Sequence, residues 1–251
     1  MDPRVSLLKE FSRGFTPGTA KVETEQYGFP FLDRLLSDGA SLEYGELTAV
    51  RLLHKYKLVN ISERRMDELL QLHITKECNV CRYFDASAND VFCFNLDNNH
   101  KANNTVVLPE MNLALHTLRN CLQGLGCEPL IVASGRGYHV WCRLDEPVEN
   151  SRLYGFMLRA AVQALMAFHG TAYDHQTIKF NFYPDVNVHN VVSLRLFGSD
   201  HAKNKVFSRV LTPDRLLGEA ASWDYFGDFL RNKAIPPARF TAAFNALPAL
   251  L

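Results

Sequence analysis

A tight glycine turn between two apolar runs constrains the fold of this chain more than any other feature. The turn is Ser134-Gly-Arg-Gly137, and it separates Leu130–Ala133 from residues 138–143. Glycine accepts the backbone angles of a tight turn, and short apolar runs on either side of such a turn are typical of two antiparallel strands. The chain must therefore contain an antiparallel sheet that includes this hairpin.

The apolar pattern predicts further strands and several helices. Helices are expected over 62–72, 109–125 and 151–168, where apolar residues recur at helical spacing behind a capping residue or a proline. Strands are expected at 79–84, 91–96, 178–182, 191–197 and 206–211, and the polar turn over 85–90 suggests that the first two form a hairpin. This order of elements indicates an α+β fold with mixed or antiparallel sheets.

The pattern also divides the chain into three parts. Residues 1–75 are predicted to be mainly helical, and residues 76–212 form a predicted core that carries the chemical motifs. Residues 213–251 are predicted to form a helical tail that packs on this core. Apolar residues make up 47% of the chain, which is ample for a core, and no apolar run approaches the length that spans a bilayer. We therefore expect a cytoplasmic protein with no membrane partner.

The cysteines and the net charge say less about function. Cys78 and Cys81, with His73 five residues before, have part of the spacing of a zinc site, but no second pair follows. Ordinary thiols in a reducing compartment are therefore favoured over zinc. The formal net charge is zero, which counts against a protein that wraps nucleic acid, although cations gather between Arg195 and Arg209.

Three separated stretches carry candidate chemistry. The first is the apolar run that ends in Asn95-Leu-Asp97, where alternation along a strand places the two polar side chains on one face. Side-chain oxygens at that position suit Mg²⁺ or Mn²⁺, although this stretch taken alone favours a polar strand end that runs into an Asn-rich turn. One of the two ligands is an amide, which weakens the case for a metal.

The second stretch is the glycine hairpin itself. Gly135 and Gly137 allow backbone N–H groups to approach an anion closely. Ser134, Arg136 and His139 add a hydroxyl, a guanidinium and an imidazole, which suit phosphate oxygens. A hairpin whose glycines only supply positive φ angles is the alternative.

The third stretch joins an acid to a basic loop. Asp185 is followed ten residues later by Arg195, and His201 and Lys203 come after a turn at Gly198. A carboxylate for a metal followed by cations for a triphosphate suits phosphoryl transfer, in which charge neutralisation supplies much of the catalysis. A solvated basic loop is the alternative.

In this order the three stretches resemble the motifs of the archaeo-eukaryotic primase superfamily. That family has a hydrophobic-Asp-hydrophobic-Asp strand, a Ser-Gly-x-Gly-x-His-like hairpin, and a third Asp followed by an Arg-x-x-x-Ser-x-His-x-Lys-like segment. The resemblance covers roughly residues 79–210. It implies a two-lobed core, with an αβ unit on an RRM-like sheet unit, and a DNA primase or polymerase that adds nucleotides from NTP or dNTP to a 3′-hydroxyl by two-metal catalysis.

The resemblance also implies roles for individual residues and partners. Asn95, Asp97 and Asp185 take the metal-ligand positions for Mg²⁺ or Mn²⁺. The nucleotide-binding positions are taken by Ser134, Arg136, Gly137, His139, Arg195, His201 and Lys203. Relatives act on single-stranded or primed DNA, and they often work with a helicase or another accessory replication protein.

One residue departs from the family pattern. Asn95 stands where the family usually has Asp, and an amide brings no negative charge to a metal. The change is natural with activity retained, natural with activity lost, or engineered, and the sequence leaves these three open. A catalytically degenerate nucleotide- or nucleic-acid-binding module is therefore the main alternative function. A nuclease is disfavoured, because hydrolysis of a diester does not call for a triphosphate site.

Overall fold

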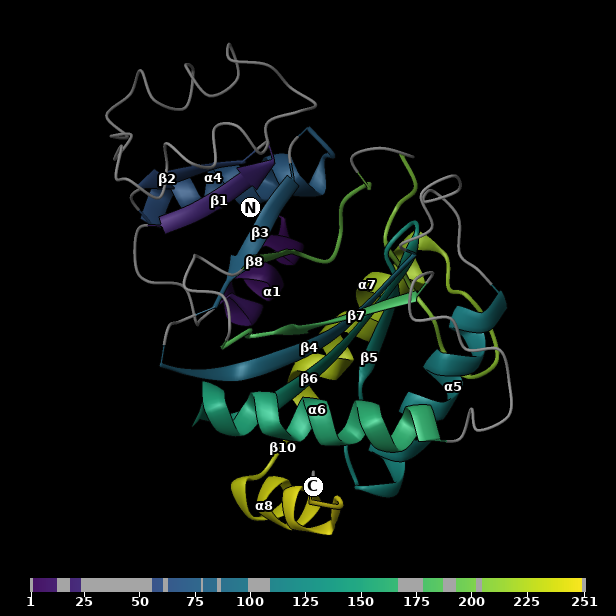
Figure 1. Ribbon diagram of the computed structural model, residues 1–251. Coiled ribbons are helices and arrows are strands. Elements are labelled where there is room, and N and C mark those ends of the chain that lie inside the picture. Colours follow the sequence, from purple (N-terminus) through teal and green to yellow (C-terminus); the bar gives the residue numbers. More distant parts are fainter. Residues whose placement is uncertain are drawn as a thin grey trace. The chain divides into compact units, whose positions relative to one another are not determined.

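A computed structural model of the chain describes residues 2–12, 19–23, 56–60, 63–77, 79–84, 87–98, 109–166, 178–186, 193–201 and 205–249. The chain forms two compact units, each built from two separated segments (Figure 1). The first unit comprises Met1–Ala86 and Val188–Phe207, and the second comprises Ser87–Asn187 and Ser208–Leu251. Helices and mainly antiparallel sheets occur in both units, which confirms the α+β class.

The first unit is built on a four-stranded antiparallel sheet with the strand order β2-β1-β3-β8. In chain order its elements are α1 (Pro3–Phe11), β1 (Thr19–Glu23), β2 (Tyr56–Asn60), α4 (Glu63–Ile74), β3 (Asn79–Tyr83) and β8 (Ser193–Arg195). The last strand comes from far along the chain and pairs with β3, so that Arg195 lies opposite Cys81. The linear division at residue 75 therefore does not match the compact units.

Two strands lie in the region that the sequence suggested to be mainly helical. β1 and β2 pair with each other over their full lengths. Polar and apolar residues alternate in Thr19-Ala-Lys-Val-Glu23, which is a strand pattern that the sequence offers. The helical prediction is therefore wrong for these residues, while α1 and α4 agree with it. Residues 24–55 lie outside the described part of the chain.

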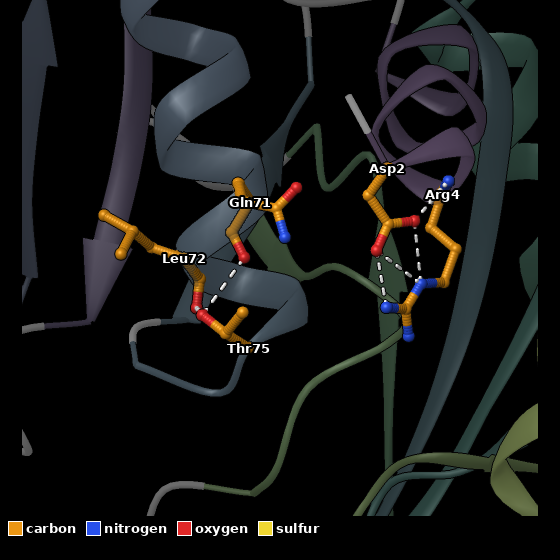
Figure 2. A network of polar contacts seen from close by, with 5 residues as sticks. All are labelled: Asp2, Arg4, Gln71, Leu72 and Thr75. Carbon is orange, nitrogen blue, oxygen red and sulfur yellow. Dashed lines mark hydrogen bonds and ion pairs between the residues drawn. The ribbon is translucent and has the colours of Figure 1, made fainter.

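Short polar contacts lie at one end of α1 and one end of α4 (Figure 2). The Asp2 side chain accepts a hydrogen bond from the Arg4 backbone N–H at 2.9 Å and is paired with the Arg4 guanidinium, which caps α1 at its N-terminus. Beyond α4, the Thr75 hydroxyl lies 3.2 Å from the backbone oxygens of Gln71 and Leu72. It thereby reaches carbonyl groups of the last turn of α4.

The second unit is built on a larger sheet with the strand order β7-β4-β6-β5-β9, and β10 pairs with β6 in parallel. In chain order its elements are β4 (Ala88–Asn98), α5 (Pro109–Gly124), β5 (Leu130–Ala133), β6 (Gly137–Glu149), α6 (Asn150–Met166), β7 (Ile178–Tyr183), β9 (Arg209–Val210), α7 (Glu219–Asn232), β10 (Ala234–Ile235) and α8 (Pro237–Ala246). The hairpin predicted around residues 134–137 is confirmed as β5 and β6. None of the helices in the described ranges is both long and apolar enough to cross a membrane.

One face of the larger sheet forms the core. Phe92, Phe94 and Leu96 of β4 are buried in one cluster with residues of α5, α6 and α8. Phe92 makes edge-on ring contacts with Phe156 of α6 at 5.5 Å and with Phe240 of α8 at 6.3 Å between centroids. Because side chains alternate along a strand, the odd-numbered residues of the same stretch of β4 lie on the other face.

The predicted pairing of β3 with β4 is wrong. β4 is flanked by β6 and β7, and β3 is flanked by β1 and β8. Since both edges of each strand are occupied, these two strands cannot pair with each other. The apolar pattern of residues 79–84 and 91–96 identified both strands correctly but carried no information on their partners.

Candidate functional site

Strand register groups the first set of candidate residues on the sheet face opposite the core. Asn95 of β4 lies between His139 of β6 and Asn181 of β7. One step further along, Asp97 lies between Gly137 and Lys179. Directly opposed residues of antiparallel strands point to the same face, so these two rows form one surface. The predicted common face of Asn95 and Asp97 is confirmed, since their side chains lie 3.5 Å apart.

The glycine hairpin closes this surface at one end. The Ser134 backbone N–H donates to the Gly137 carbonyl oxygen at 2.8 Å, and Gly135 adopts a φ of 106°. That angle lies in the region that favours glycine, so the turn itself requires glycine at position 135. At position 137 the close approach of β6 to β4 requires glycine, because a side chain there would clash with the Leu96 backbone.

The tip of the hairpin carries Arg136, which reaches back to Asp97. Its Nε donates to Asp97 Oδ1 at 2.9 Å, and its Nη2 donates to Oδ2 at 2.7 Å. This is the bidentate geometry in which a guanidinium recognises a carboxylate. The side chains of Arg136 and Asp97 are 28% and 18% exposed, so solvent reaches the pair. Arg136, the candidate phosphate ligand, and Asp97, the candidate metal ligand, are therefore bound to each other in this structure.

Asn95 is buried beside this pair, at 5% exposure. Its Nδ2 lies 3.5 Å from Asp97 Oδ2, which is a long contact, and its Oδ1 has no hydrogen-bond partner within the described part of the chain. A buried oxygen without a partner costs free energy, and a metal ion would satisfy it. The Asn95 oxygen therefore fits a metal ligand, whereas Asp97 is already occupied by Arg136.

Asp185 belongs to the same unit but not to the same row. It follows β7 by two residues, at the end of that strand where Tyr183 lies opposite Cys93. Asp97 lies opposite Lys179, near the other end of β7. In the described residues, no group of three or more His, Cys, Asp and Glu side chains could hold a metal ion. A metal site that unites Asn95, Asp97 and Asp185 remains a prediction.

The basic candidates lie in the first unit. Arg195 ends β8, is buried, and donates from Nη1 to the Ser199 carbonyl oxygen at 3.0 Å. The His201 backbone N–H donates to the Val206 carbonyl oxygen at 2.8 Å. Lys203 lies outside the described residues. The union of these cations with the Asn95–His139 surface in one site also remains a prediction.

His73 has a role that its sequence context did not reveal. Its Nδ1 accepts the Val80 backbone N–H at 2.9 Å, and its Nε2, which must then carry the hydrogen, donates to the Phe197 carbonyl oxygen at 2.9 Å. The buried ring therefore joins α4, β3 and the turn after Arg195. The pKa of His73 is lowered to about 4, chiefly by burial and to a smaller extent by the nearby charge of Arg195.

These two hydrogen bonds bear on the zinc prediction. Both ring nitrogens of His73 are used, so this histidine is not placed to bind a metal. Cys81 is buried, and Cys78 lies outside the described residues. His100, His175 and His189, which lie near the motifs in the sequence, also fall outside them.

Comparison with known proteins gives little support for any family. No protein-family model matches the chain, and no curated protein matches it. One solved structure with some similarity is the polymerase domain of Mycobacterium tuberculosis Ligase D in complex with DNA. The TM-score is 0.48 and the sequence identity 14%, over 98% of this chain and 91% of that one. Similarity at this level establishes neither a shared family nor a shared activity.

Proposed function

We propose that this chain is a template-dependent nucleotidyltransferase, a DNA primase or polymerase of the archaeo-eukaryotic primase type. The observation that carries the proposal is the register that sets Asn95 beside His139 and Asp97 beside Gly137. It brings two motifs that are about forty residues apart onto one solvent-accessible surface, as a nucleotide site requires. The resemblance assigns the same nucleotide to Arg195 and His201 of the third motif, which belong to the first unit.

In this proposal each group has a task that matches its chemistry. Asn95, Asp97 and Asp185 would hold Mg²⁺ or Mn²⁺, which supplies activation of the attacking 3′-hydroxyl and charge neutralisation at the leaving pyrophosphate. His139 and the Ser134 hydroxyl are suited to orient the phosphates of NTP or dNTP. Arg195, His201 and Lys203 add positive charge for the triphosphate. Template and primer DNA are the macromolecular partners.

The alternative is a catalytically inactive module that binds nucleotide or nucleic acid. It is favoured by one observation, namely that the single carboxylate of the two rows is paired with Arg136. The two functions predict different responses to a restored carboxylate at position 95.

Primer extension by Asn95→Asp separates the two functions. The added carboxylate should raise the rate of primer extension by at least on the order of tenfold, because even substitutions of residues that only support the metal ligands change activity by that much. Extension of a labelled primer on single-stranded template, with Mg²⁺ and with Mn²⁺, is the measurement. Asn181→Asp is the matched control, since it places the same charge one strand away in the same row.

Each outcome of this test has a clear meaning. A gain confined to Asn95→Asp supports a metal position at residue 95. If the chain, Asn95→Asp and Asn181→Asp are all inert with either metal while NTP still binds, the polymerase proposal is wrong and the binding module stands.

Nucleotide binding itself tests the phosphate ligands. His139→Ala and Arg195→Ala should each weaken NTP binding by about 1.5–3 kcal/mol, the range for a hydrogen bond to a charged group. Fluorescence titration with a labelled nucleotide measures the change. Arg231→Ala, which removes an exposed arginine at the end of α7, is the control for net charge. Equal affinities in all variants would remove both residues from the site.

A further inference from the structure

The ion pair between Arg136 and Asp97 joins two residues that the proposed function assigns to different ligands. We infer that Arg136 takes the place of the metal ion on Asp97 in the free protein, and that the phosphates of the nucleotide draw Arg136 away when metal and nucleotide bind together. This inference rests on the proposed function, and it goes beyond it by making Arg136 the residue that couples metal binding to nucleotide binding.

The geometry of the pair supports this exchange. Both oxygens of Asp97 accept a hydrogen bond from the guanidinium, at 2.9 and 2.7 Å. A divalent cation bound to either oxygen would lie close to this fixed positive charge, and the two cations would repel each other. Asp97 can therefore serve as a strong metal ligand only after Arg136 has left it.

The charges around the pair point in the same direction. Asp97 is the only carboxylate in the two rows, whereas Lys179 lies directly across from it on β7 and is exposed. Asn95 adds an oxygen but no charge. With Arg136 and Lys179 present, the described residues of this surface carry more positive than negative charge. In the free protein this surface therefore favours an anion over a metal ion.

The phosphate oxygens of a nucleoside triphosphate can replace the Asp97 carboxylate as the hydrogen-bond partner of Arg136. The guanidinium fork fits phosphate oxygens as well as it fits a carboxylate. Once Arg136 has moved, the Asp97 carboxylate, the Asn95 oxygen that has no hydrogen-bond partner, and the phosphate oxygens are all available to one metal ion. Each ligand then strengthens the binding of the other, and this coupling is reciprocal.

Titration of the free protein with Mn²⁺ tests the inference. Free and bound Mn²⁺ are distinguished by electron paramagnetic resonance, without nucleotide and without turnover. Arg136→Gln should bind Mn²⁺ on the order of tenfold more tightly than the unchanged chain, a coupling of ordinary size. A non-hydrolysable NTP should strengthen Mn²⁺ binding to the unchanged chain, after correction for the Mn²⁺–NTP complex, and should have much less effect on Arg136→Gln.

Two further variants separate the ion pair from general charge effects. Lys179→Gln removes one positive charge from the same row without breaking the pair, so its Mn²⁺ affinity should change much less than that of Arg136→Gln. Arg136→Lys keeps the charge but loses the bidentate fork, and it should lie between the unchanged chain and Arg136→Gln. The graded order of the four proteins is the expected result.

The outcomes also separate this inference from the proposed function. If the unchanged chain extends primers but Arg136→Gln binds Mn²⁺ no more tightly, the inference is overturned and the function stands. If Arg136→Gln binds Mn²⁺ more tightly, and NTP strengthens Mn²⁺ binding to the unchanged chain much more than to Arg136→Gln, but no variant, including Asn95→Asp, extends a primer, the coupling stands and the polymerase function is wrong. Equal effects of Lys179→Gln and Arg136→Gln would also overturn the inference, because general electrostatics would then suffice.

Discussion

Replacement of Gly137 by alanine is expected to lower the free energy of unfolding of the second unit by about 3 kcal/mol, at the upper end of the usual cost of overpacking. A Cβ atom at this position would overlap the Leu96 carbonyl oxygen, and it would lie 3.0 Å from the Leu96 carbonyl carbon. The obstacle is backbone of the central strand β4, which cannot rotate away as a side chain can. Either β6 must shift or the strand pair must open.

The consequence extends to the candidate site. Gly137 is the register partner of Asp97, and His139, two residues on, is the partner of Asn95. A shift of β6 that relieves the clash would therefore separate the rows that bring the two motifs together. Loss of stability and loss of nucleotide binding should appear in the same variant.

The same substitution elsewhere in this unit provides a matched control. At Gly155, inside α6, an added Cβ would meet only the Phe244 ring, at an ordinary contact distance of 3.6 Å. Gly155→Ala should be neutral or stabilising by about 0.5–1 kcal/mol, because alanine favours the helix. Urea denaturation followed by circular dichroism measures both variants. If Gly137→Ala unfolds at the same urea concentration as the unchanged chain, the close approach of β4 and β6 is wrong.

In this protein the sequence predicts the local geometry of a segment better than it predicts which strands pair with each other. Alternation along residues 92–97 correctly placed Asn95 and Asp97 on one face, and the glycine turn correctly placed a hairpin at 134–137. Both are properties of a few neighbouring residues. The pairing of β3 with β8 and of β4 with β6 and β7 depends on contacts between distant segments, on which the period of a strand gives no information.

The candidate site shows the same limit. Each motif assigned a separate ligand to Arg136 and to Asp97, because a motif describes one stretch of chain at a time. Their ion pair becomes visible only when β4 and β6 are aligned. His73 shows the limit again, since its hydrogen bond to Phe197 spans 124 positions of the chain. A buried histidine that joins two distant segments looks, in sequence, like any histidine at the end of a helix.

The stability of the first unit is expected to fall when the pH drops from about 6.5 towards 4, and His73 is the cause. In the folded protein the pKa of His73 is lowered from 6.5 to about 4, mainly by burial. Between these values the unfolded chain binds a proton that the folded chain excludes, so the free energy of unfolding decreases as the pH falls. A difference of that size corresponds to about 3 kcal/mol for a fully buried group.

The structure explains why protonation is unfavourable there. A proton on Nδ1 would face the Val80 N–H, which now donates to that nitrogen, and it would break the hydrogen bond. The added charge would be buried and would lie near the guanidinium of Arg195. Both effects act on the segment that holds Arg195 and Phe197, so acidification should loosen this segment together with α4 and β3.

Urea denaturation between pH 7 and pH 4.5 measures this effect against two variants. His73→Gln removes the titrating ring, so it should be less stable than the unchanged chain near pH 7 but should lose less stability on acidification. His116→Gln removes an exposed histidine of α5 and should follow the unchanged chain at every pH. All three proteins contain the same Asp and Glu residues, so the difference between their curves isolates His73. Parallel curves for His73→Gln and the unchanged chain would show that this ring does not control the acid stability of the unit.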